Sequence, residues 1–349
     1  MKHIRCSALL LASLSPLVAC SDSAKTDADY QAEIVVSIHD SIETDLADLV
    51  QAAKDLQTAA PTHAWNATTD ATAIASMLTA WKKARVGYEH VEGATAPLYG
   101  DLDITMDARY DDYLSTLGAA GDQDLFDDKG VTGMHGIERI LYAPQIRQEV
   151  ISFEDTLPGY KAAAWPATDG EAMEFKTKLA QKLIDDATSL HDSWKPAAAD
   201  LAQAYSGLVG LMNEQKEKVN LAASGEEESR YANITLFDLR NNLEGTTKIY
   251  ALFQPWAQSK ANGKDADTKI EAKLAALTSL YAATSGDALP AVPADWSNDN
   301  PTAANLATPF GMLWDAVHKD VDPSADGSVV FEMNKIAVAL GYPQFVEGE

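Results

Sequence analysis

The sequence predicts an all-α protein made of two packed helical bundles of the four-helix type. Apolar residues recur at three- and four-residue spacing over most of the 349-residue chain, as expected for amphipathic helices. No segment shows the alternation of apolar and polar residues that is typical of a half-buried strand. A stretch rich in proline, glycine and aromatic residues, 144–170, separates two groups of helical segments. We therefore expect it to connect the two halves.

The first half, residues 31–150, is expected to hold four helices, at 34–56, 70–96, 107–117 and 131–142. Ala60-Pro61 closes the first segment, because proline cannot continue a helix. Asp70 is a favourable N-cap for the second, which runs to Ala96-Pro97.

The second half, residues 151–349, continues in the same pattern after the connecting stretch. Helices are expected at 173–190, 198–223, 236–253, 269–283 and 329–340. Ser224-Gly225 and Asn262-Gly263 break the pattern between helices, and residues 284–309 form a long loop that contains proline.

The N-terminus has the features of an export signal with a lipid attachment site. Lys2 and Arg5 precede an apolar run that is too short to span a bilayer. The run ends in Leu-Val-Ala-Cys, which resembles a bacterial lipoprotein box with Cys20 as the lipidated residue. We expect residues 1–19 to be the signal peptide and 20–30 a polar tether, with the protein anchored at the periplasmic face of an envelope membrane.

Charge and cysteine content exclude several classes of protein. The formal net charge is −25, so the surface repels phosphate backbones and nucleic acid is not an expected partner. The two cysteines are Cys6, inside the signal, and Cys20, so no pair remains to form a disulfide in the processed chain.

The expected helix 70–96 carries charges on its apolar face. Projection at about 100° per residue places Arg85 and Glu92 in the middle of the face that contains Trp81 and Tyr88, with Glu89 at its margin. Charged side chains are costly there without partners. Two interpretations remain open: a buried Arg85–Glu92 pair or network that fixes packing, or carboxylates that point into an internal site.

The segment Gly133 to Glu138 contains a histidine and a glutamate three residues apart. Residues at this spacing project to one side of a helix, so His135 and Glu138 could offer a nitrogen and an oxygen to one metal ion. Alone, such a pair is weak evidence. The remainder of the helix is apolar, so the pair needs either a metal or a hydrogen-bonded network, and Gly133 and Gly136 would let another backbone approach.

No established catalytic motif accompanies this pair. The zinc-protease pattern of two histidines four apart is missing, and Arg139 stands where the inverted pattern requires histidine. There is also no phosphate-binding loop, dinucleotide fingerprint or Gly-x-Ser-x-Gly elbow.

Several segments in order resemble the imelysin-like family, and within it the periplasmic iron-uptake lipoproteins of the EfeO and EfeM type. They are AWKKARVGYEHVE at 80–92, GDLD at 100–103, MDAR at 106–109 and TGMHGIE at 132–138, followed by Tyr231, Asp238, Asn242 and Gly245. The resemblance covers most of residues 31–256. The family often has Tyr-Ser-His where this chain has Tyr231-Ala232-Asn233, so a ligand from that position is in doubt.

The resemblance implies two helical bundles and a metal site. Its centre would be His135 and Glu138, with Glu89, Glu92 and Asp107 as further carboxylate ligands. Arg85, Tyr88 and Arg109 lie in the same segments and are expected to support the site.

Three functions are therefore weighed. The first is capture of iron, as Fe²⁺ or Fe³⁺, for a membrane permease or a peroxidase-like partner; oxygen ligands with one imidazole suit iron, and zinc or copper(II) could still bind. The second is a metallopeptidase, with Glu89 or Glu92 as the base, because the family carries a peptidase label. The third is a non-catalytic structural envelope lipoprotein with an internal salt-bridge network.

Overall fold

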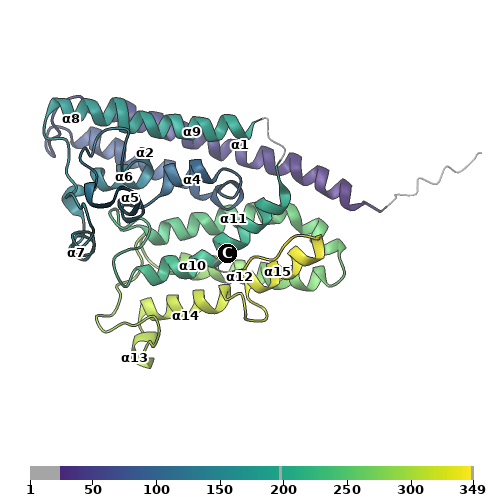
Figure 1. Cartoon of the computed structure of the whole chain (residues 1–349). Helices are drawn as coiled ribbons and strands as arrows, with labels where there is room; N and C mark the ends of the chain where they lie inside the picture. The colour runs from purple at the N-terminus through teal and green to yellow at the C-terminus, as the bar shows by residue number, and fades with distance from the viewer. Residues whose placement is uncertain (1–23, 196–198, 347–349) are drawn as a thin grey trace, which may run out of the picture.

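The computed structural model describes residues 24–195 and 199–346, and within these ranges every regular element is a helix (Figure 1). This confirms the predicted all-α fold. The predicted signal peptide, 1–19, and Cys20 lie outside the described residues. In the part of the chain that the structure describes, no helix combines the length and apolar character needed to cross a membrane.

The helices form two groups, which lie one above the other in Figure 1. The first group contains α1 (Asp27–Ala59), α2 (Ala71–Glu89), α4 (Gly100–Asp107), α5 (Tyr110–Leu117), α6 (Gly133–Leu141), α7 (Gln148–Glu154), α8 (Asp169–Glu174) and α9 (Ala180–Trp194). The second contains α10 (Leu201–Leu221), α11 (Thr235–Ser259), α12 (Gly263–Ala283), α13 (Ala303–Leu306), α14 (Pro309–Val321) and α15 (Val329–Leu340). The short α3 (Glu92–Thr95) packs against α10 and α11. One continuous apolar core runs through both groups.

Helix α1 starts earlier than the sequence suggests. The side chains and backbone N–H groups of Thr26 and Asp29 bond reciprocally in a capping box, so the helix begins at Asp27, inside the segment 20–30 that was expected to be a tether. Its buried residues recur along one face from Ile34 to Leu56, as predicted, and it ends before Ala60-Pro61.

Helix α9 packs alongside α1 although 120 residues and the connecting stretch lie between them in the sequence. The Trp194 ring stacks on His39 with 5.6 Å between ring centroids, and its indole N–H donates to the His39 carbonyl oxygen at 3.2 Å. His191 lies 2.8 Å from Glu43. The chain therefore returns to the first bundle after residue 151 before it enters the second.

The single helix expected over 70–96 is wrong: α2 ends at Glu89 and α3 begins at Glu92. The break lies where α11 crosses. A Cβ at Gly245 would lie 2.3 Å from the carbonyl oxygen of His90, so α11 approaches closely at this point, and Asn242 donates to the Glu89 carbonyl oxygen at 3.4 Å. Glu92 consequently leaves the face that carries Arg85.

The helix expected over 107–117 is also divided, and Asp107 ends α4 instead of beginning a helix. Gly133, at the start of α6, has a φ of +74°, and a Cβ there would lie 2.5 Å from the carbonyl oxygens of Thr105 and Met106. The predicted close approach at Gly133 is thus confirmed, and it seats α6 directly against the end of α4.

Helix α14 is not among the helices expected from the sequence. Its start is well marked, since Thr308 caps it by accepting a hydrogen bond from the Gly311 N–H and Pro309 occupies the first turn. Phe310, Leu313 and Val317 bury its apolar face.

Candidate metal centre

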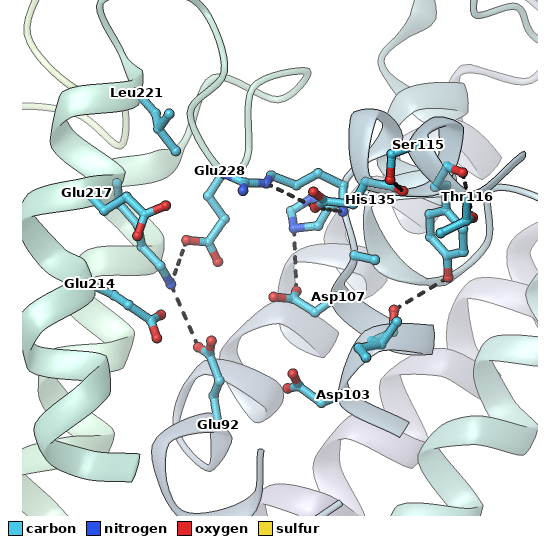
Figure 2. Close-up of a pocket in the computed structure, with 16 residues that line it drawn as sticks. Glu92, Asp103, Asp107, Ser115, Thr116, His135, Glu214, Glu217, Leu221 and Glu228 are labelled. Atoms are coloured by element: carbon cyan, nitrogen blue, oxygen red, sulfur yellow. Dashed lines mark hydrogen bonds and ion pairs between the residues drawn. The ribbon is translucent and has the colours of Figure 1, made fainter. Parts of the chain in front are cut away.

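A polar cavity of about 610 Å³ lies between the first group of helices and α10 (Figure 2). Most of its charged lining residues are acidic. The lining consists of Glu92, Asp103, Ile104, Asp107, Ala108, Arg109, Asp112, Tyr113, Ser115, Thr116, His135, Glu214, Glu217, Lys218, Leu221 and Glu228. Seven carboxylates face only two permanent cations, so the cavity attracts positive ions.

His135 is held in one orientation by Glu138. Its Nδ1 lies 2.7 Å from Glu138 Oε2, and because a carboxylate only accepts, Nδ1 carries the donated proton. The other oxygen, Glu138 Oε1, accepts from the backbone N–H groups of Tyr231 at 3.1 Å and Ala232 at 2.8 Å. Glu138 is fully buried and does not line the cavity. It therefore directs the other imidazole nitrogen, Nε2, toward the cavity, as carboxylates behind metal-binding histidines do.

Helix α6 holds this histidine firmly against α2. The indole N–H of Trp81 donates to the Met134 carbonyl oxygen at 2.9 Å, in the fully buried interior. With Gly133 seated against α4, the two residues that precede the histidine are both fixed.

Asp107, His135 and Glu228 meet at the cavity wall. Each offers a ligand atom within 4.8 Å of the others, and all three line the cavity. His135 Nε2 lies 3.4 Å from Asp107 Oδ1. Figure 2 shows the three side chains turned toward the same open space. Two carboxylates and one imidazole are a donor set that suits iron, manganese or zinc and does not suit copper(I).

Arg85 stands behind these three residues. Its guanidinium bonds Asp107 and Glu89, lies 2.6 Å from Glu228, and reaches Asp238 at 3.5 Å. It is completely buried and absent from the cavity lining. Of the two open interpretations, the buried network is present, but Arg85 pairs with these four carboxylates and not with Glu92.

The charges on this network follow from competition between burial and pairing. Burial would raise the pKa of Asp107, but Arg85 and His135 outweigh burial and lower it. At Glu228, Lys218 and then Arg85 outweigh burial and lower the pKa. Burial and Arg85 lower the pKa of His135, whereas its hydrogen bonds to Asp107 and Glu138 prevail and raise the pKa to about 9.

Glu89 lies deeper than the cavity. With Glu228 and Asp238 it forms a second carboxylate group whose ligand atoms lie within 4.8 Å, but the Arg85 guanidinium already contacts all three. Burial raises the pKa of Glu89 well above its usual value and that of Asp238 to about 7.

Glu92 lines a different part of the cavity from His135. Its Oε2 accepts from Asn242 at 2.8 Å and lies 3.8 Å from Lys218 Nζ. The predicted ligands are thus divided: Asp107 and His135 come together, Glu138 lies behind the histidine, Glu89 is beneath Arg85, and Glu92 stands beside Lys218.

The expected supporting residues occupy the margins. The Tyr88 hydroxyl donates to Asp103, a cavity residue whose pKa is raised to about 6 by burial and by Asp107. Arg109 lines the cavity and lies 3.4 Å from Asp112. Asn233, in the position where the family often has histidine, adopts a left-handed φ of 55° and does not line the cavity.

Glu228 and Lys218 are site residues that the sequence analysis missed. Glu228 belongs to the acidic run 226–228, a pattern typical of a solvated loop, yet it is only 5% exposed. The signal that could have identified it is its place three residues before Tyr231, at the start of the second-half segment that resembles the family.

Comparison with known proteins shows that the sequence model of the imelysin family, peptidase family M75, matches residues 42–308. The chain belongs to the imelysin family. The match spans the first bundle from α1 onward, the cavity and most of the second bundle. In this imelysin the second-half residues Tyr231, Asp238 and Asn242 all contact the network around the cavity.

Curated relatives of this imelysin have names connected with iron uptake. The iron uptake system component EfeM of Pseudomonas syringae is 26% identical over 209 residues, covering 60% of this chain and 59% of that protein. The iron uptake system component EfeO of Escherichia coli O1:K1 is 30% identical over 178 residues, covering 51% and 36%. An Efem/EfeO family lipoprotein of Staphylococcus aureus is 29% identical over 180 residues, covering 52% and 50%. This chain therefore aligns with less than two thirds of each relative's length.

Two solved structures share the fold over nearly their whole length. An imelysin-like protein from Psychrobacter arcticum has a TM-score of 0.57 at 13% identity, covering 93% of this chain and 99% of that one. A putative iron-regulated protein A precursor from Parabacteroides distasonis has a TM-score of 0.56 at 14% identity, covering 92% and 97%.

Proposed function

We propose that this imelysin captures a metal ion, iron in the cell, at Asp107, His135 and Glu228 and passes it to an iron permease or a peroxidase-like partner in the envelope. The observation that carries the proposal is the convergence of two carboxylates and an oriented imidazole on the wall of an acidic cavity. The names of the relatives supply the choice of iron. Zinc or copper(II) could occupy the same donors in vitro, because affinity rises along the divalent series toward copper.

The role assigned to Glu138 differs from that of a direct ligand. Both of its oxygens already accept hydrogen bonds from His135 and the backbone at 231–232. We assign it to orienting His135, and we assign Glu228 as the second carboxylate ligand in its place. Glu89 and Glu92 serve as surrounding carboxylates.

Titration of the mature protein with Fe²⁺ under anaerobic conditions, and with Mn²⁺ as an air-stable probe, tests the proposal. Wild type should bind one ion at the site, and His135→Ala and Asp107→Asn should lose most of the affinity. Exposed Asp48 on α1 supplies a control, because Asp48→Asn removes the same charge far from the cavity. Unchanged binding in both site variants would remove these residues from the proposal.

A structural role is the second candidate, and Arg85 favours it. The guanidinium contacts Asp107, Glu228, Glu89 and Asp238, so these carboxylates already have a cation among them. Failure of the purified and reconstituted protein to retain Fe²⁺ or Mn²⁺ would favour this reading. The peptidase name of the family is tested in the same preparation, by incubating the metal-loaded protein with unfolded proteins and looking for cleavage that His135→Ala abolishes.

We also propose that the protein is held at the membrane through lipid on Cys20 after removal of residues 1–19. Two or more acyl chains give stable anchoring where one chain is marginal. Cys20→Ala should move the folded protein to the soluble periplasmic fraction or block its processing. Identical soluble fractionation of wild type and variant would refute the anchor and leave the metal proposal intact.

A further inference from the structure

Lys218 places a permanent positive charge inside the acidic cavity. It projects from α10, and its ammonium nitrogen lies 2.6 Å from Glu228 Oε2, 3.0 Å from Asn242 Oδ1 and 3.8 Å from Glu92 Oε2. Its side chain is only 10% exposed. Its three nearest polar neighbours are two carboxylates and an amide oxygen, and such acceptors favour the charged ammonium.

The partner of this ammonium is also a member of the candidate metal centre. Glu228 Oε1 accepts from Arg85, and Glu228 Oε2 contacts Lys218, so both oxygens already face a cation. Arg85 does not line the cavity, whereas Lys218 lines the space from which an ion must approach. An incoming metal ion therefore has to share Glu228 with the ammonium or displace it.

Other hydrogen-bond acceptors for the Lys218 ammonium lie close to Glu228. Glu92, Glu214 and Glu217 line the same cavity as Lys218, and Asn242 bonds both Lys218 and Glu92. A flexible lysine side chain can lean from Glu228 toward these acceptors when a metal takes Glu228, and return when the metal leaves. A guanidinium fixed by four carboxylates, as Arg85 is, lacks that freedom.

We propose that Lys218 is a built-in competing cation that weakens metal binding at Asp107, His135 and Glu228 and so makes the cargo releasable. This inference rests on the proposed function and extends it, because a carrier has to give up its ion to a partner. A unit positive charge and a divalent ion about 5 Å apart, at an effective dielectric constant near 20, repel strongly enough to lower affinity by about 10⁴-fold or more. Movement of the lysine away from the ion reduces this to the ten- to hundredfold effect expected.

The test compares Mn²⁺ binding and release in three purified full-length mature variants beside wild type. Lys218→Gln should bind Mn²⁺ about ten- to a hundredfold more tightly and release it to a chelator more slowly. Lys218→Arg keeps the positive charge, so its Mn²⁺ affinity should stay close to that of wild type. Lys182→Gln is the matched control: Lys182 pairs with Asp186 on α9 at 2.8 Å and is not among the cavity residues, so it removes the same charge elsewhere.

The variant Lys218→Gln leaves Glu228 and Glu92 with fewer partners, so its folding is checked by circular dichroism. Should it fail to fold, Lys218→Gln combined with Glu92→Gln removes one surplus carboxylate and is titrated instead. Affinity that is unchanged or weaker relative to Lys182→Gln overturns the role of Lys218 while the metal proposal stands. Absence of Mn²⁺ and Fe²⁺ binding in wild type overturns the proposed function itself.

Discussion

Glu138 illustrates how a buried carboxylate can orient a histidine without lining the cavity that the histidine faces. It accepts three hydrogen bonds, one from the His135 imidazole and two from backbone N–H groups 93 and 94 residues further along the chain. The direction of the imidazole is therefore set by tertiary structure as well as by the helix that carries it.

Replacing this residue tests that dependence. In Glu138→Gln an amide cannot accept from all three donors and its negative charge is gone, so His135 should lose its fixed orientation. Metal affinity should fall about ten- to a hundredfold, as for other residues that orient metal-binding histidines. Mn²⁺ titration measures it. Glu149→Gln, at a 57% exposed side chain on α7, is the control, and equal affinities in the two variants would contradict the orienting role.

At this scale the sequence predicted some site residues and could not predict others. His135 and Asp107 lie in segments that resemble the family, and both reach the cavity wall. Glu228 could not be identified from the sequence, because an acidic run usually stays in water. Its burial depends on Arg85 and Lys218, which lie 143 and 10 residues away in the sequence. No local pattern records such a contact.

Among the helices, positions of caps were easier to predict than positions of breaks. Ala60-Pro61 ends α1 as expected, because proline acts locally. The interruption after Glu89 has no local cause of that kind and coincides with α11 pressing Gly245 against His90. A break imposed by a neighbour 155 residues away cannot be read from periodicity.

Gly133 couples the packing of α6 against α4 to the candidate metal centre. Gly133→Ala should destabilise the protein by about 2–4 kcal/mol, because the new methyl group would meet two carbonyl oxygens of α4 and the positive φ is strained for alanine. Asp107 ends α4, so metal affinity should fall as well. Urea denaturation and Mn²⁺ titration measure the two effects.

The matched control for that variant is Gly341→Ala. Gly341 also has a positive φ, of 80°, but a Cβ there would meet nothing within 4 Å. This variant should lose only about 1 kcal/mol from backbone strain and keep its metal affinity. Similar losses in the two variants would show that the close approach of α6 to α4 is unimportant.

Asp45 joins three helices and makes their packing depend on pH. It lies 3.1 Å from His90 and 2.7 Å from Lys248, which belongs to α11. Burial raises the pKa of Asp45, but hydrogen bonds from these two residues outweigh it and lower the pKa below 3.8. A lowered pKa means that the charged carboxylate stabilises the fold above about pH 4, and that this contribution is lost as the pH falls through the folded-state pKa.

Asp45→Asn should therefore reduce the free energy of unfolding by about 1 kcal/mol at pH 7, a modest value because Lys248 is partly exposed. The difference from wild type should shrink as the pH is lowered below 4. Urea denaturation at pH 7, 5 and 3.5 measures it, with Asp48→Asn at an exposed position of the same helix as reference. A difference that stays constant across this range would rule out the ionised carboxylate as its source.

In the whole molecule, buried charges join the two bundles in addition to the shared apolar core. Arg85 of α2 contacts Glu228 and Asp238 of the second half, and Lys218 of α10 contacts Glu92. The all-α architecture could be predicted from helical periodicity, and the two bundles from the resemblance to the family. The way in which they are joined could not, because it depends on pairs about 125 to 155 residues apart.

Arg85→Met tests how much the buried ion pairs between the two bundles contribute to stability. The substitution keeps an extended side chain but leaves several buried carboxylates without their cation, so stability should fall by about 3–5 kcal/mol. Urea denaturation compares it with Arg109→Met, where the arginine is partly exposed and pairs with the exposed Asp112 at 3.4 Å. A loss below about 1 kcal/mol in Arg85→Met would mean that water or movement replaces the guanidinium.

The packing of α9 against α1 has a consequence for the order in which the protein can fold. The contact between His39 and Trp194 closes a loop of more than 150 residues, and folds dominated by such distant contacts form slowly. The long apolar face of α1 is synthesised before the other helices of the described chain. Its bundle is complete only once α9 has been added. The contacts between α1 and α9 can form only after residue 194 has been synthesised, so the first bundle is completed late in synthesis.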